Sequence, residues 1–61
     1  MFEFELLTHV ADKVTGYDGI ITARAEYSYN NVNQYLVENT DSTGRPVEVW
    51  IAEDRLVSDD D

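Results

Sequence analysis

The chain has 61 residues, with 13 acidic side chains against four Lys and Arg, no Cys and one His, so its formal net charge is −9. A chain of this length forms at most one domain with a small core, because a domain of about 60 residues buries only about 60% of its unfolded surface. Without cysteine it has no disulfide framework and no Cys-based zinc site, and one His is too few for a His-rich metal cage. No apolar run approaches the roughly 18 residues of a membrane span, so we expect a soluble protein of a reducing cytosol with no membrane partner. The lack of the staples that stabilise most mini-proteins favours a homodimer.

The acidity does not mark a disordered chain. Hydrophobic residues make up 43% of the sequence, which is far from the composition of disordered acidic tails. Only the run from Ser58 to Asp61 is typical of a solvated tail, because like charges repel and nothing there can be buried. We therefore expect one domain over residues 1–57 and a disordered acidic tail over residues 58–61.

The first half of the chain predicts three strands and one loop. Aromatic and aliphatic residues alternate with Glu from Phe2 to Leu7, which is the period of a half-buried strand. Val10 to Gly19 carries two glycines three residues apart and is expected to be a loop. Ile20 to Tyr29 is rich in β-branched and aromatic residues and predicts a second strand. Asn30 and Asn31 suit a two-residue hairpin turn that leads into a partner strand from Val32 to Glu38.

The second half predicts another loop and another strand. Asn39 to Arg45 is a loop by composition, and Pro46 suits the first position of the next strand, which tolerates its missing N–H. In that strand apolar residues alternate with Glu48 and Trp50. The apolar residues, which we expect to face the core, are Val47, Val49 and Ile51.

The last segment completes the predicted fold. Ala52 to Leu56 is expected to form a single helical turn, with acids in its first turn and an Arg near its end, and Val57 closes a last short strand. Five short strands with glycine-containing turns predict a mainly β fold. Two forms fit: a small antiparallel SH3-like barrel, or a strongly twisted five-stranded sheet with one short helical turn that finds its cover in a second subunit.

Two segments of the sequence carry a recognisable pattern. Residues 12–27 contain a Lys-Val-Thr-Gly-aromatic-x-Gly segment followed by an Ala-Arg strand, and residues 50–56 form an aromatic-x-x-Glu-x-x-Leu ending. With this pattern the chain resembles a group of short proteins encoded by tailed phages and prophages, and the match covers most of the chain. The resemblance implies an SH3-like fold and a phage origin, and therefore a location in the cytoplasm of a bacterial host.

Catalysis and cofactor binding are not expected. His9 is the only imidazole and has no cysteine to pair with, so we expect it to be structural or solvent-facing. The serines lack the context of a nucleophile elbow. Neither the pair Glu53 and Asp54 nor the run from Asp59 to Asp61 has the spaced loop of a calcium site. We therefore predict a protein without enzyme activity, metal or other cofactor.

The net charge predicts what kind of partner the protein has. Four basic side chains among 13 acidic ones disfavour direct nucleic-acid binding, which needs cations to neutralise phosphates. Duplex DNA carries one charge per about 1.7 Å, so a domain about 27 Å across matches a length with about 16 charges. We expect a DNA mimic that binds and inhibits a host DNA-binding or DNA-processing protein. The alternative is a generic protein-interaction or virion-associated SH3-like module whose acidity serves only solubility.

Acidic side chains and one indole make up the predicted partner-binding surface. The main charge carriers on the folded body are Glu26, Glu38, Glu48, Glu53 and Asp54. The acids expected to extend that surface are Glu3, Glu5, Asp12 and Asp18. Trp50 belongs either to the core or, if exposed, to the binding surface as a hot spot.

The remaining aromatic and apolar residues are expected to be buried. Those assigned to the core or to a subunit contact are Phe2, Phe4, Tyr27 and Tyr35. Those assigned to a shared face of the second strand are Ile21, Ala23, Ala25 and Tyr27.

Overall fold

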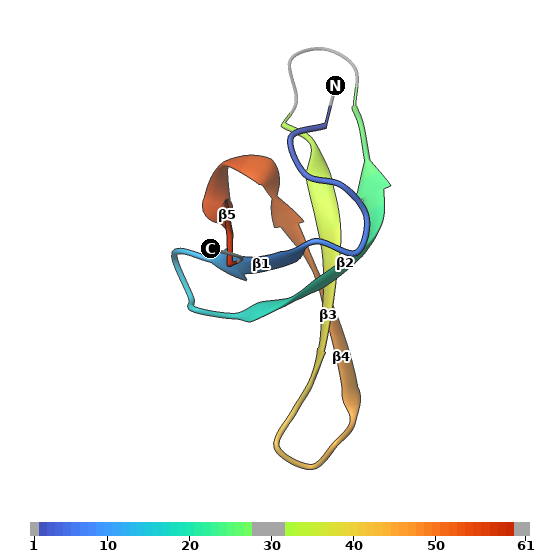
Figure 1. Cartoon of the computed structure of the whole chain (residues 1–61), viewed down its shortest axis with the longest axis vertical. Coiled ribbons are helices and arrows are strands. Elements are labelled where there is room, and N and C mark those ends of the chain that lie inside the picture. The colour runs from blue at the N-terminus through green and yellow to red at the C-terminus, as the bar shows by residue number, and fades with distance from the viewer. Residues whose placement is uncertain (1, 28–31, 60–61) are drawn as a thin grey trace.

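A computed structural model describes residues 2–27 and 32–59 and shows one antiparallel sheet (Figure 1). Its elements are β1 (His9–Asp12), β2 (Asp18–Ala25), β3 (Gln34–Thr40), β4 (Pro46–Ala52), the 3₁₀ helix η1 (Glu53–Arg55) and β5 (Leu56–Ser58). The strand order is β4-β3-β2-β1-β5, with antiparallel pairing between all neighbours. The mainly β prediction is confirmed, and the sheet is open, because β4 and β5 form its two edges. In Figure 1, β1 crosses the long β3–β4 hairpin at a steep angle, so the sheet is strongly twisted.

The prediction of a first strand from Phe2 to Leu7 is wrong. These residues form an irregular arm that turns at Leu6 and Leu7, where Leu7 has a positive φ of 70°. The alternation that suggested a strand has another cause. Both Phe2 and Phe4 place their rings edge-on against Tyr35, at centroid distances of 5.9 and 5.5 Å, and the arm covers the inner face of the sheet in this way.

The prediction of a loop from Val10 to Gly19 is also wrong over half of its length. β1 covers the first three residues of this range and pairs with both β2 and β5, and β2 covers the last two. Only residues 13–17 form a connection, which the Gly16 N–H closes by donating to the Asp12 carbonyl at 2.7 Å, with Gly16 at a φ of 82°. The charged Asp12 made this segment look unlike a buried strand. It nevertheless occupies a buried position of β1, where its ion pair with Arg55 neutralises the charge.

β2 ends earlier than predicted and contains an irregularity that sequence periodicity does not reveal. The register shifts between Ile21 and Ala23, which pair with Val37 and Leu36. Since Val37 and Leu36 are neighbours on β3, this bulge places Ile21 and Ala23 on opposite faces, and the predicted shared face is wrong. The expected turn at Asn30 and Asn31 lies outside the described residues.

The rest of the chain follows the prediction closely. β3 extends to Thr40 rather than ending at Glu38, because its ladder with β4 continues to Pro46. Pro46 opens β4, η1 lies within the predicted helical turn, and β5 contains the expected strand residue Val57. Ser58, expected in the acidic tail, pairs with Val10 instead.

A small core fills the inner face of the sheet. The buried apolar residues are Val10, Ile21, Tyr35, Val37, Ile51 and Leu56. Phe2, Phe4 and Tyr17 pack against them, which confirms the core assignment of Tyr35 and places both Phe rings at the core boundary. Tyr27 is 47% exposed and is not part of the core. Val49 is 41% exposed because β4 is an edge strand.

The molecule is longer in one direction than expected. It measures 39 × 23 × 20 Å, because the β3–β4 hairpin extends beyond the rest of the sheet (Figure 1). Among the described residues, no helix has the length and apolar character that crossing a membrane requires.

Candidate protein-interaction surface

The side of the sheet opposite the core carries an apolar and acidic surface, which we call the outer face. The cross-strand register defines it. Leu36 pairs with Ala23 and Trp50, and Glu38 pairs with Ile20 and Glu48. Tyr35, Val37 and Ile51, which alternate with these residues along β3 and β4, are buried in the core. Because side chains alternate along a strand, the outer face of β2, β3 and β4 consists of Ile20, Ala23, Gln34, Leu36, Glu38, Glu48, Trp50 and Ala52.

The apolar half of the outer face is accessible to solvent. Trp50 is 49% exposed and Ile20 is 36% exposed. Leu36, between Ala23 and Trp50 in the same cross-strand row, is partly exposed. Trp50 is therefore a surface residue, and tryptophan is the residue type most enriched among interface hot spots.

The acidic half of the outer face holds two carboxylates in direct opposition. Glu38 and Glu48 are cross-strand partners, and like charges in this position destabilise a sheet. Glu38 accepts a hydrogen bond from the Thr22 hydroxyl at 2.8 Å. Within residues 2–27 and 32–59, neither glutamate forms an ion pair. The pair thus leaves an electrostatic cost that a cation from another molecule would relieve.

The four basic side chains of the protein lie elsewhere. Arg24 is on the inner face, where its guanidinium stacks over the Phe2 ring at 4.4 Å. Arg55 is paired with Asp12. Lys13 lies in the turn after β1, and Arg45 lies in the turn that joins β3 to β4. None of the four occupies an outer-face strand position, so the outer face carries acidic side chains and no Lys or Arg.

Two shallow hollows lie at the ends of the outer face. One, of about 440 Å³, is lined by Tyr27, Val32, Gln34 and Ala52. The other, of about 330 Å³, is lined by Ile20, Thr22, Glu38, Asn39, Thr40 and Pro46. Both include outer-face positions, so the surface is hollowed on each side of the Leu36 and Trp50 row.

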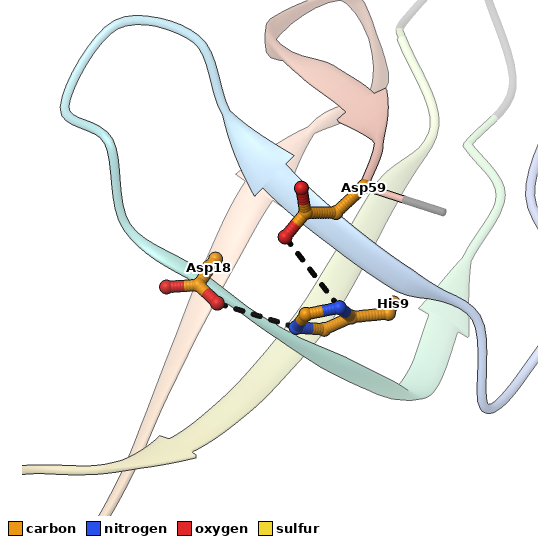
Figure 2. Close-up of side chains that lie close together, drawn as sticks. All are labelled: His9, Asp18 and Asp59. Carbon is orange, nitrogen blue, oxygen red and sulfur yellow. Dashed lines mark hydrogen bonds and ion pairs between the residues drawn. The ribbon is translucent and has the colours of Figure 1, made fainter. Parts of the chain in front are cut away.

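A second cluster, which the sequence analysis did not identify, surrounds His9 of β1, between β2 and the residue that follows β5 (Figure 2). The Asp18 carboxylate lies 3.2 Å from Nε2 of the ring, and the Asp59 carboxylate lies 3.5 Å from Nδ1. All three side chains are about half-exposed. The Asp59 N–H donates to the His9 carbonyl at 2.9 Å, so β5 leads the chain back to β1. The three residues are far apart in sequence, and only the strand order brings them together.

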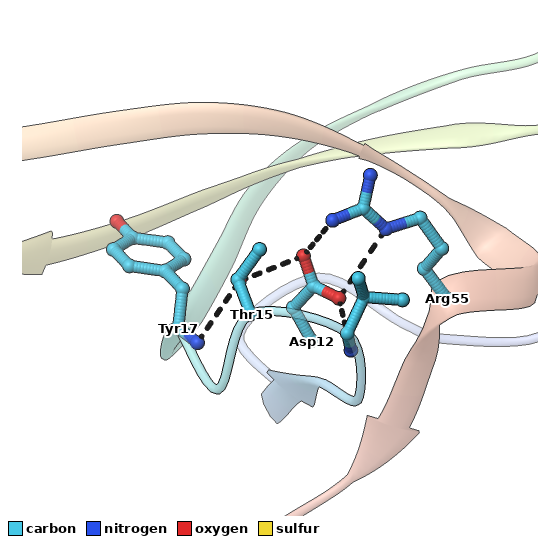
Figure 3. Close-up of polar contacts among 5 residues, drawn as sticks. Asp12, Thr15, Tyr17 and Arg55 are labelled. Atoms are coloured by element: carbon cyan, nitrogen blue, oxygen red, sulfur yellow. Dashed lines mark hydrogen bonds and ion pairs between the residues drawn. The ribbon is translucent and has the colours of Figure 1, made fainter.

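Asp12 is not part of the binding surface on which it was predicted. Its side chain is 2% exposed, and its carboxylate accepts hydrogen bonds from the Arg55 guanidinium, the Thr15 hydroxyl and the Val14 N–H at 2.6 to 3.3 Å (Figure 3). Burial acts to raise the pKa of Asp12, but the Val14, Arg55 and Thr15 hydrogen bonds together lower it below its ordinary value. This ion pair ties β1 to η1 and has a structural role.

Glu53 is also engaged within the protein. Its carboxylate accepts hydrogen bonds from the Tyr35 hydroxyl, from the Glu3 N–H at 3.0 Å and from the Asn33 amide at 3.4 Å. The Tyr35 hydrogen bond is the main reason why the pKa of Glu53 lies below its ordinary value. Burial raises the pKa of Tyr35, and the hydrogen bond to Glu53 adds to that shift. Glu53 therefore fastens the N-terminal arm.

The other predicted acids are exposed but dispersed. Glu3 and Glu5 belong to the arm, Asp54 to η1, and Glu26 follows the end of β2. The structure thus brings Glu38, Glu48 and Trp50 together on one face and leaves these four acids outside that group. Comparison of the chain with protein-family models, with curated proteins and with solved structures found no match.

Proposed function

We propose that this protein binds a basic surface of another protein through its outer face. The observation that carries the proposal is the opposed pair Glu38 and Glu48 beside the half-exposed Trp50, on a face that carries no Lys or Arg. An arginine fits both parts of this surface. Its guanidinium forms paired hydrogen bonds with carboxylates and stacks on an indole ring.

The partner class that best matches this chemistry is a protein that uses Arg and Lys to hold nucleic-acid phosphates. Its basic groove presents cations to Glu38 and Glu48, and the net charge of −9 accelerates the encounter at low salt. The protein then acts as a DNA mimic and inhibits its partner by occupying the groove. With a phage origin, the partner is a host DNA-binding or DNA-processing protein in the bacterial cytoplasm.

A homodimer is part of this proposal. β4 is an edge of the sheet and pairs on one side only with the described strands. An unpaired edge is a template for pairing with another chain. Pairing of β4 with its copy would place the two outer faces next to each other and double the acidic surface.

A second candidate function rests on the apolar half of the same face. Its apolar side chains are partly exposed: Leu36 and Trp50 are cross-strand partners, and Ile20 lies on the same face. Such a surface would suit a generic protein-interaction or virion-associated module. In that case the acids serve solubility alone. The two functions differ in salt dependence, since apolar contacts persist when electrostatic ones are screened.

The experiment that tests the proposal is capture of partners from bacterial lysate on the immobilised protein, with elution by a salt gradient. Three versions are compared: the wild type, the double variant Glu38→Gln with Glu48→Gln, and the control Glu3→Gln with Glu5→Gln, which removes the same charge from the arm. We expect a DNA-binding protein that elutes at moderate salt, is lost with the outer-face variant and is kept by the control.

The captured protein must then lose its DNA binding when the wild-type chain is added. Equal capture by the two variants would contradict a role for the outer face. Capture that is independent of salt, or a partner that still binds DNA normally, would favour the apolar module instead.

A further inference from the structure

Both ring nitrogens of His9 face a carboxylate oxygen (Figure 2). A neutral imidazole carries one N–H and one lone pair, so it can donate to only one of the two. The other nitrogen then directs its lone pair at a carboxylate, which is repulsive unless a cation lies between them. The arrangement of His9, Asp18 and Asp59 therefore calls for a positive charge that a neutral ring does not supply.

We propose that His9 and Asp18 bind a zinc ion, with Asp59 as the residue that orients the imidazole. Nε2 and the Asp18 oxygen are 3.2 Å apart. With Zn–N and Zn–O bonds of about 2.0–2.2 Å, this separation corresponds to an angle at the metal of about 100°, which is near the tetrahedral value. Zinc can thus enter between the two atoms with little movement of either side chain.

Asp59 lies on the other side of the ring, where metal-bound histidines usually find a hydrogen-bond acceptor. In protein zinc sites the second ring nitrogen commonly donates to a carboxylate, which fixes the tautomer and increases the basicity of the ligand. The Asp59 carboxylate is 3.5 Å from Nδ1 and is positioned for this role. One donor atom from each of the three residues lies within 4.8 Å of the other two.

The chemical types of these ligands indicate which metal ion the site would bind. An imidazole with carboxylates suits zinc and its neighbours among the transition metals, whereas calcium and magnesium prefer shells made of oxygen alone. The three side chains are about half-exposed, so water can complete the coordination. The site joins β1 and β2 to the residue that follows β5, and in the cross-strand row Ile20 lies between His9 and Glu38.

The test is a zinc titration of the untagged protein, followed by the NMR signals of the single His ring and of the backbone amides. We expect a saturable shift of the His9 signals, with a neutral ring metallated at Nε2 and protonated at Nδ1. Magnesium at the same concentrations should leave the ring unchanged. The amide spectrum of each variant shows independently whether the fold is intact.

Three variants locate the ligands. Asp18→Asn should abolish the saturable shift, and Asp59→Asn should weaken zinc affinity roughly ten-fold. Asp54→Asn, which removes one exposed charge from η1, should bind zinc like the wild type. The proposal is overturned if zinc leaves the His9 ring signals unchanged at neutral pH, if Asp18→Asn binds zinc as well as Asp54→Asn, or if magnesium produces the same ring shifts.

Discussion

Replacing Tyr35 with Phe removes one hydroxyl from the point where the N-terminal arm meets the sheet. That hydroxyl donates to the Glu53 carboxylate and accepts from the N–H groups of Glu3 and Phe4 at 3.0 and 3.2 Å. The ring itself is fully buried and would stay in place in Tyr35→Phe, with its edge contacts to Phe2 and Phe4 intact. The substitution therefore isolates the polar contribution of the hydroxyl.

The expected loss of stability follows from the kinds of hydrogen bond removed. A hydrogen bond to a charged group contributes about 1.5–3 kcal/mol and a neutral one about 1 kcal/mol. Water can reach the part-buried N–H groups of Glu3 and Phe4 once the hydroxyl is gone, so their loss adds little. We expect Tyr35→Phe to lower the free energy of unfolding by about 2–3 kcal/mol, which for a domain of this size lowers Tm by about 10–20 °C.

Urea unfolding monitored by circular dichroism measures this loss, and Tyr17→Phe is its matched control. The Tyr17 hydroxyl has one proton and two carbonyl acceptors, Val37 and Val47, both at 3.0 Å, so its removal should cost only about 1 kcal/mol. In a double-mutant cycle, Tyr35→Phe and Glu53→Gln should show a coupling energy of about 1 kcal/mol or more. A cost for Tyr35→Phe no greater than that for Tyr17→Phe would refute the reasoning.

Other perturbations have equally definite outcomes. Gly19→Ala should prevent normal pairing of β2 and β3, because the added Cβ would lie 2.2 Å from the Glu38 carbonyl oxygen. Gly44→Ala should lower the free energy of unfolding by only about 1–2 kcal/mol, because its sole cost is the φ of 85° at that position. Urea unfolding that finds Gly44→Ala less stable than Gly19→Ala would contradict the register of β2 and β3. The pKa values of Asp12, Asp41 and Glu53 lie below their ordinary values of 3.8, 3.8 and 4.5, so the unfolded chain binds protons first on acidification. These three carboxylates should contribute their full stabilisation at pH values above their ordinary pKa values. That contribution should decrease as the pH falls through and below those values, and an unfolding free energy that rises steadily from pH 5 to pH 3 would contradict this expectation. Trp50→Ala should cost about 1.5–2.5 kcal/mol in thermal unfolding, about half of the 3–5 kcal/mol typical of a core aromatic, because half of the residue is exposed; the full core value would show that Trp50 is buried.

The strands that the sequence predicted well are those whose pattern reflects local structure. Pro46 opens β4 and the turn before it contains Gly44, so turn residues and alternation together define this hairpin. The arm and β1 could not be predicted in the same way. Phe2 and Phe4 alternate because both contact Tyr35 across the molecule, and Asp12 is tolerated in a buried strand only because Arg55 reaches it from the other end of the chain.

The candidate surface was predictable in composition but not in arrangement. Glu48 and Trp50 were expected on the same face of one strand, and the structure places them there. That Glu38 lies opposite Glu48 depends on the register of the hairpin, which is fixed by the whole ladder from Gln34 to Ala52. Likewise, the bulge between Ile21 and Ala23 decides which apolar residues reach the outer face, and no residue type marks it.

The central claim is that Glu38, Glu48 and Trp50 form a binding site for the cations of a partner. Trp50 is the single tryptophan of the chain, so its fluorescence reports directly on that site during titration with an arginine-rich peptide. We predict saturable binding by the wild type and by the control Glu3→Gln with Glu5→Gln, and affinity about ten-fold weaker, or about 1.4 kcal/mol, for Glu38→Gln with Glu48→Gln. Equal affinities for the two double variants, which carry the same net charge, would contradict the claim.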